Sequence, residues 1–154
     1  MNVVRSNPLE LPAHMDPDED LSRADLVFYG VDHSGQSYEA LVYVDASDET
    51  FGERDPTRGY AGSFTVFGHA GCYGEEGHCL PADRFEDEFD RRAAHPMTPY
   101  TKTVTVTDTI RDALRAGKST VTVTVLAIVP DSALGAADPE PLKFRSVRLV
   151  TFEG

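Results

Sequence analysis

The stretch from Ser119 to Pro130, STVTVTVLAIVP, is the strongest β-strand signal in the sequence. Its β-branched residues alternate with a period of two, as the pleat of a strand requires. One face would carry Val121, Val123, Val125, Ala127 and Val129, and the other would carry threonines followed by Leu126 and Ile128. Because its second half is apolar on both faces, we expect this strand to lie centrally in a sheet.

Shorter strand signals surround this stretch. They are DLVFYGVD (25–32), SYEALVYVD (37–45), YAGSFTVFGH (60–69), TKTVTVTD (101–108) and LKFRSVRLVTFE (142–153). In the stretch 37–45, residues 38, 40, 42 and 44 share one face, which we expect to be the core face. About six closely spaced strands predict an antiparallel β-sandwich, jelly-roll-like in form.

One short helix is expected within this all-β fold. The segment TIRDALRAGK has Ile110 and Leu114 four residues apart, so they would share a helix face. Asp108 is the predicted N-cap, and Gly117 is the predicted stop signal.

The length of 154 residues fits one domain, which we place at residues 24–154. Residues 1–23 contain three prolines and the acidic run DPDED, with no sustained apolar periodicity. We therefore expect a flexible N-terminal arm there. The start also lacks a basic end followed by an apolar stretch, which favours a cytoplasmic protein as encoded, exported only together with a partner.

The charge balance narrows the class of partner. Lys and Arg total 14 and Asp and Glu total 26, which gives a formal net charge of -12. Such a surface repels phosphate backbones and anionic lipid headgroups. No apolar run approaches the roughly 20 residues that cross a bilayer. Neither nucleic acid nor a membrane is an expected partner.

The order of several short motifs resembles the C-terminal domain of polyphenol oxidases and other tyrosinase-family proteins. In chain order they are LVFYGVD, YEALVYVD, GYAGSF, TDTIRDAL, VTVTVLAIVP and VRLVTFE. The stretch FGHAGCYGEEGHC with the later HPMTP is similar to the bacterial version of this domain. The Lys-Phe-Asp-Val motif usual in the plant version is replaced by Glu39-Ala40-Leu41-Val42 or a nearby stretch. The resemblance implies a β-sandwich that packs on a dicopper catalytic domain.

The chain does not carry that catalytic domain itself. A type-3 copper centre needs about six imidazoles, and the sequence has five histidines, with none at helical ligand spacing. The P-loop, the G-x-S-x-G elbow and the H-E-x-x-H motif are also missing from the sequence. We therefore expect a protein that is not an enzyme by itself.

Any chemistry is expected in the long irregular stretch 70–99, since a loop of this length is often functional. His69, Cys72, His78 and Cys79 could together hold copper or zinc, because thiolates and imidazoles suit these ions. His95 could reach the same ion, or serve as a hydrogen-bonding strut. A disulfide between Cys72 and Cys79, worth about 2 to 3 kcal/mol, is another interpretation, and two free thiols are a third.

Tyr73 lies within this stretch, between Cys72 and Gly74. The tyrosinase-family resemblance implies a side chain that enters the copper site and occupies the place of a phenolic substrate, which we term the plug. Tyr73 is the first candidate plug, and Phe67 and Phe85 are the next. An ordinary buried or surface tyrosine is the competing interpretation.

Two functions follow from these expectations. In the first, the chain covers, stabilises or loads copper into a separate tyrosinase-like catalytic domain or subunit and shields its active site. In the second, it is a stand-alone small metal-binding or redox module that uses the loop with His69, Cys72, His78 and Cys79. A small β-sandwich enzyme with pocket residues that the sequence does not reveal is a third alternative.

Overall fold

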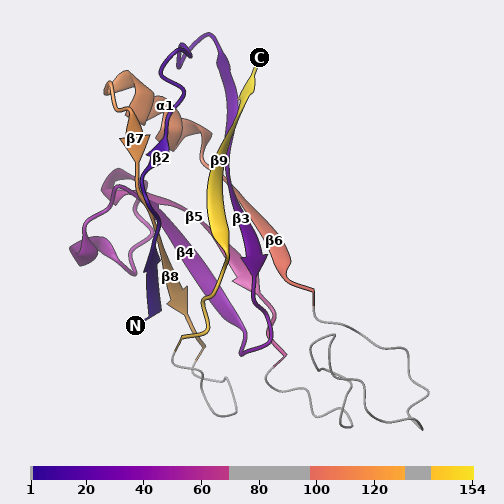
Figure 1. Cartoon of the computed structure of the whole chain (residues 1–154). Coiled ribbons are helices and arrows are strands. Elements are labelled where there is room, and N and C mark those ends of the chain that lie inside the picture. Colours follow the sequence, from indigo (N-terminus) through magenta and orange to yellow (C-terminus); the bar gives the residue numbers. More distant parts are fainter. Residues whose placement is uncertain (1, 70–97, 131–139) are drawn as a thin grey trace, which may run out of the picture.

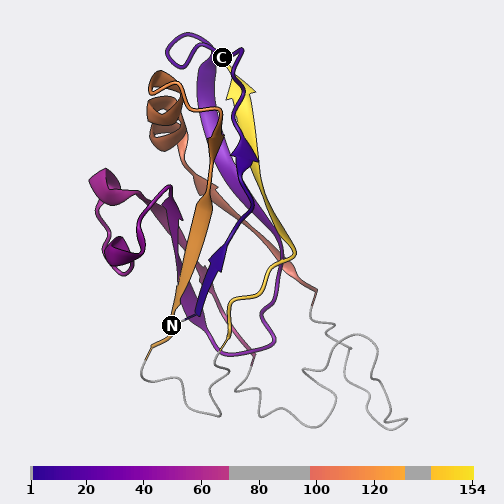
Figure 2. The same cartoon turned by 60° about the vertical axis from the view of Figure 1, so that its left-hand side comes forward.

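The computed structural model describes residues 2–69, 98–130 and 140–154 and has the predicted antiparallel β-sandwich. A four-stranded sheet has the order β1 (Asn2–Arg5), β8 (Val123–Ile128), β4 (Tyr38–Val44) and β5 (Tyr60–Val66). A three-stranded sheet has the order β6 (Tyr100–Thr105), β3 (Leu21–Val31) and β9 (Ser146–Glu153). A small ladder joins β2 (Leu9–Glu10) and β7 (Thr120–Val121), and α1 (Thr107–Arg115) lies at the end of the sandwich where the chain terminates (Figures 1 and 2).

The core lies between the two sheets. The predicted core face of β4 is confirmed, because Tyr38, Ala40, Val42 and Val44 are all buried there. β8 is central as predicted, between β1 and β4. The other face of the four-stranded sheet has a second small cluster, in which Leu41 and Leu126 lie directly opposite each other under Phe51 and Tyr60. This cover explains why β8 is apolar on both faces.

The cover is formed by the connection between β4 and β5, which contains the short helical turns η1 (Asp48–Thr50) and η2 (Pro56–Arg58). Arg54 forms two hydrogen bonds to the Glu39 carboxylate, at 2.9 and 2.7 Å. The Tyr43 hydroxyl donates to the Glu53 carbonyl and accepts from the Gly52 amide. These bonds hold the connection against the outside of the sheet.

The helix α1 begins two residues earlier than predicted, and its N-cap is Val106 rather than Asp108. The Val106 amide donates to the Ala24 carbonyl, and the Thr107 hydroxyl accepts from the Ala24 amide. The start of the helix is thus set by a contact with β3 that no local pattern indicates. Gly117, with φ of 71°, does follow the helix end as predicted.

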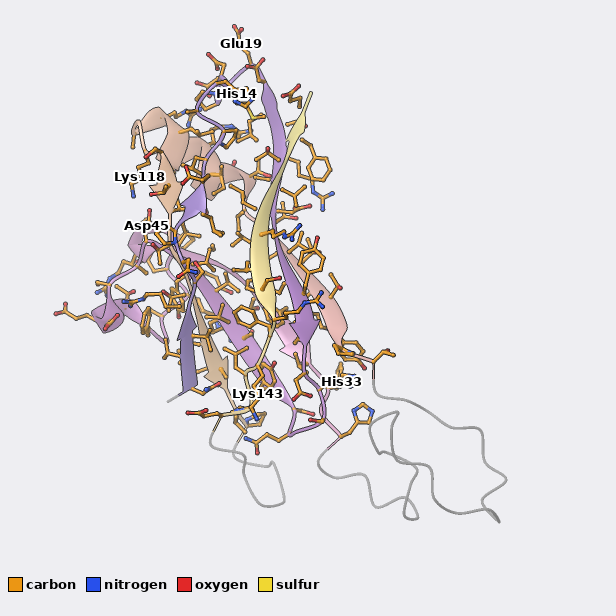
Figure 3. The ribbon with its side chains drawn as sticks, viewed as in Figure 1. His14, Glu19, His33, Asp45, Lys118 and Lys143 are labelled. Carbon is orange, nitrogen blue, oxygen red and sulfur yellow. The ribbon has the colours of Figure 1, made fainter. Side chains whose placement is uncertain are left out.

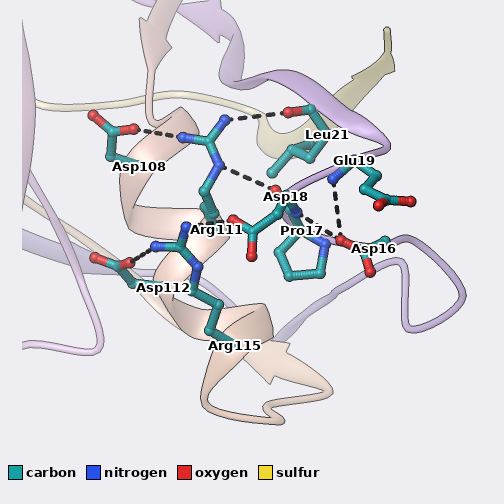
Figure 4. Close-up of polar contacts among 9 residues, drawn as sticks. All are labelled: Asp16, Pro17, Asp18, Glu19, Leu21, Asp108, Arg111, Asp112 and Arg115. Atoms are coloured by element: carbon teal, nitrogen blue, oxygen red, sulfur yellow. Dashed lines mark hydrogen bonds and ion pairs between the residues drawn. The ribbon is translucent and has the colours of Figure 1, made fainter.

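The N-terminal segment departs from the expectation of a flexible arm. Its first residues pair with β8, and Leu11 and Met15 are buried in the core. Figure 4 shows how α1 holds the segment, with the Arg111 guanidinium donating to the carbonyls of Pro17 and Leu21. These partners lie about 90 residues away in sequence, so composition alone could not indicate them.

Candidate functional site

The β3–β4 connection lies at one end of the sandwich, where β5 ends and β6 begins (Figures 1 and 2). The Ser34 amide donates to the Asp32 carboxylate at 2.8 Å, which forms a tight turn. The Gly68 amide donates to the Ser37 hydroxyl at 3.0 Å. A Cβ at position 68 would lie 2.1 Å from the Gly35 carbonyl oxygen, so only glycine allows this approach. The turn and the end of β5 are therefore closely packed.

His33, labelled in Figure 3, is the central side chain of this end. Its Nε2 lies 2.8 Å from the Thr98 carbonyl oxygen, and its Nδ1 lies 3.1 Å from the Nδ1 of His69. The residue is only 6% exposed, and its ring stacks on Tyr100, with ring centroids 3.9 Å apart and an interplanar angle of 17°. His33 thus holds the chain at positions 69 and 98 together.

These contacts determine the protonation pattern of the neutral pair. A carbonyl oxygen only accepts, so the His33 Nε2 carries a hydrogen and its Nδ1 carries a lone pair. His69 then donates from its own Nδ1, which lies 3.1 Å from the His33 Nδ1 and 3.2 Å from the His33 carbonyl oxygen. The His69 amide donates to the same carbonyl at 3.0 Å. The result is a fixed bis-imidazole unit, which we call the histidine pair.

Two other titratable groups lie close to this end. Burial alone would raise the pKa of Asp32, but the hydrogen bonds from Ser34 and the nearby charge of Lys143 outweigh it, so the pKa lies below its usual value. Burial, with the charge of Asp32, raises the pKa of Tyr38 to about 12. The Tyr38 hydroxyl is buried and has no hydrogen-bond partner within the described part of the chain.

The structure describes only two of the predicted site residues. His69 contacts His33, and Phe67 is 74% exposed just beyond the end of β5. The other candidates lie outside the described residues, so their roles stay predictions; they are Cys72, Tyr73, His78, Cys79, Phe85 and His95.

The sequence analysis did not single out His33, which lies between the predicted strands 25–32 and 37–45. A signal existed in the antiparallel pairing of β4 with β5, where Tyr38 lies opposite Val66. Extending this register beyond the strand ends places position 69 opposite position 35, two residues from His33. No local motif marks His33.

The described residues do not form a dicopper centre. No group of three or more His, Cys, Asp or Glu side chains is placed to hold a metal ion within residues 2–69, 98–130 and 140–154. The histidine pair supplies two nitrogen ligands, whereas a type-3 centre needs about six imidazoles. In the same part of the chain, no helix is long and apolar enough to cross a bilayer.

Comparison with known proteins gives similarity of fold. No protein-family model matches the sequence, and no curated protein matches it. Among solved structures, latent aurone synthase (polyphenol oxidase) from its natural source aligns with a TM-score of 0.56 and 17% identity, covering 99% of this chain and 25% of that chain. The recombinantly expressed form aligns with a TM-score of 0.54 and 17% identity, covering 99% and 24%. The chain thus spans about a quarter of the length of these proteins.

Proposed function

We propose that this chain is a companion domain that covers and stabilises a tyrosinase-like dicopper oxidase and shields its active site. The observation that carries the proposal is the fold similarity, which extends over 99% of this chain but only 25% of a polyphenol oxidase chain. Those neighbours are described as latent, which denotes an enzyme with suppressed activity. A covering domain is a physical means of such suppression, since it excludes substrate from the copper ions.

The end of the sandwich that carries the histidine pair is the surface we propose for this contact. Phe67 follows β5 directly and leaves most of its ring in water. Burying a phenylalanine ring in a partner contributes about 2 kcal/mol. The predicted plug Tyr73 follows His69 by four residues, and the histidine pair holds the start of that segment in a fixed position. A rigid base lowers the entropy lost when a side chain enters a pocket.

Delivery of copper to the oxidase is a second candidate role. The contact between His33 and His69 favours it, because two imidazole nitrogens that face each other suit copper or zinc. The ligands proposed from the sequence, Cys72, His78, Cys79 and His95, would complete such a site. When bound, the ion would be held by this chain before its transfer to the catalytic domain.

The test combines the full chain with the catalytic part of a polyphenol oxidase that lacks its covering domain. We expect the chain to bind and to reduce the rate of phenol oxidation several-fold at saturation, because substrate access is blocked. Tyr73→Ala should restore oxidation if Tyr73 is the plug. Equal suppression by both forms would show that Tyr73 is not the plug and would leave only general covering. If the chain does not bind and does not reduce oxidation, the proposal is contradicted.

Phe67 and Phe152 provide a matched comparison in the same assay. Both are exposed phenylalanines, at 74% and 45%, but Phe152 lies near the opposite end of the molecule, at the end of β9. We expect Phe67→Ala to weaken binding of the catalytic part about tenfold or more, and Phe152→Ala to leave it unchanged. The reverse result would move the contact surface to the other end of the sandwich.

A further inference from the structure

We propose that His33 and His69 form a binding site for one divalent late transition-metal ion, held by their two Nδ1 atoms. The site goes beyond the sequence-based ligand set, because His33 is not part of that set. It also requires no oxidase partner, since both ligands belong to the described part of this chain.

The distance between the two nitrogens suits a shared ion. Imidazole nitrogens bind zinc at about 2.0 to 2.1 Å, so two of them at angles of about 90° to 110° lie about 2.9 to 3.4 Å apart. The observed Nδ1–Nδ1 distance is 3.1 Å. The two Nδ1 atoms are therefore already at the separation that one shared ion requires, and each ring would turn so that its lone pair points at the ion instead of at the other nitrogen.

His33 has the environment of a metal ligand. Histidine ligands usually donate their other ring N–H to a carbonyl or a carboxylate, which fixes the tautomer and directs the lone pair at the metal. His33 has this arrangement, because its Nε2 donates to the Thr98 carbonyl at 2.8 Å and leaves the Nδ1 lone pair directed at His69. Stacking on Tyr100 and burial further restrict the ring.

His69 can become the second ligand without net loss of a proton. In the ion-free pair its hydrogen is on Nδ1, between the two rings. Binding an ion requires a lone pair there, so the hydrogen moves to its Nε2 and the ring remains neutral. The His69 backbone keeps its bond to the His33 carbonyl, at 3.0 Å. Two metal–nitrogen bonds would replace the contacts that the His69 Nδ1 hydrogen makes with the His33 Nδ1 and the His33 carbonyl oxygen, and water would occupy the other positions on the ion.

The chemistry of the ligands indicates the class of ion. Neutral imidazoles suit copper, nickel and zinc, whereas magnesium and calcium require oxygen ligands. By the usual order of stability, Cu²⁺ should bind more tightly than Ni²⁺ or Zn²⁺. Ni²⁺ is the better probe here, because it does not oxidise the two cysteines of the chain.

The experiment measures Ni²⁺ binding to the full chain by calorimetry, both with its cysteines and as the variant Cys72→Ser/Cys79→Ser. We expect binding in both forms and at least a tenfold loss of affinity with His33→Gln or His69→Gln. His14→Gln is the matched control, because His14 is an exposed histidine in a different loop, and it should leave the affinity unchanged. Unchanged affinity in either test variant, or loss of binding when only the cysteines are replaced, would overturn the site.

A second measurement covers the case in which a variant fails to fold. In the unsubstituted chain, addition of Zn²⁺ should shift the Nδ1 resonances of His33 and His69 in ¹⁵N NMR and leave those of His14 in place. Absence of these shifts at saturating Zn²⁺ would overturn the proposal. Since no oxidase is present in either experiment, the outcome is independent of the covering role.

Discussion

At the scale of single residues, the buried hydroxyl of Tyr38 has no hydrogen-bond partner in the described part of the chain. An unsatisfied buried polar group costs about 1 to 3 kcal/mol. We expect Tyr38→Phe to leave the free energy of unfolding unchanged or to raise it by about 1 kcal/mol, as measured by urea denaturation. Tyr43→Phe is the control, because the Tyr43 hydroxyl has two partners, and it should lose about 1 to 2 kcal/mol. Equal losses in the two variants would contradict this reasoning.

Tyr38 also predicts how stability depends on alkaline pH. The folded chain holds the pKa of Tyr38 at about 12, above the usual tyrosine value of about 10. As the pH rises, the unfolded state therefore loses the Tyr38 proton before the folded state does. The free energy of unfolding is unaffected by this group below about pH 10, and it falls as the pH rises from there toward 12. Between pH 9 and 12, the free energy of unfolding should fall less steeply with pH for Tyr38→Phe than for the unsubstituted chain. Parallel curves would show that Tyr38 does not titrate in this way.

At the scale of elements, Gly62 allows β5 to approach β6. Its φ is 142°, and a Cβ there would lie 2.7 Å from the Val104 Cγ1 of β6. We expect Gly62→Ala to lower the free energy of unfolding by about 2 kcal/mol or more, because backbone strain and overpacking add. Gly52→Ala serves as control, since Gly52 also has a positive φ but no atom within 4 Å of the added Cβ, and should cost about 1 kcal/mol. Adding Val104→Ala should recover part of the free energy of unfolding lost in Gly62→Ala, and none of that lost in Gly52→Ala.

The helix α1 offers another test at this scale, through its hold on the N-terminal segment. Arg111 donates to the backbone carbonyls of Pro17 and Leu21 and is mostly buried, so water competes little for these hydrogen bonds. Arg111→Ala should increase amide exchange at Asp20 and Leu21, whose amides bond to the Asp16 carbonyl in this segment. Arg58→Ala removes an exposed ion pair with Glu53 elsewhere and should leave that exchange unchanged.

Local patterns predicted most of the elements because each depends on near neighbours. The alternation in β4 and β8 identified the core faces correctly, and Gly117 marked the end of α1. The pattern at the start of α1 was misleading because the capping partner, Ala24, is distant in sequence. The N-terminal segment was misread for the same reason, since its partners lie on β8 and α1.

At the scale of the whole molecule, the sequence predicted the sandwich fold more completely than it predicted the candidate site. The sandwich follows from many alternating positions, so an error at one position matters little. The histidine pair instead depends on a single approach between two connections, set by the register of β4 with β5. Phe67 was identified as a candidate from its residue type, whereas its exposure is a result of where β5 ends.

The contacts of His33 with His69 and with the Thr98 carbonyl have a consequence for how such a chain can evolve. Both positions are fixed by a residue of the β3–β4 turn, so their spacing does not depend on the sequence that joins them. Doubling the length of a loop adds only about 0.6 kcal/mol to the entropic cost of closing it. Insertions and deletions there should therefore be tolerated by the sandwich. New specificities could then arise in this connection while the rest of the domain stays unchanged.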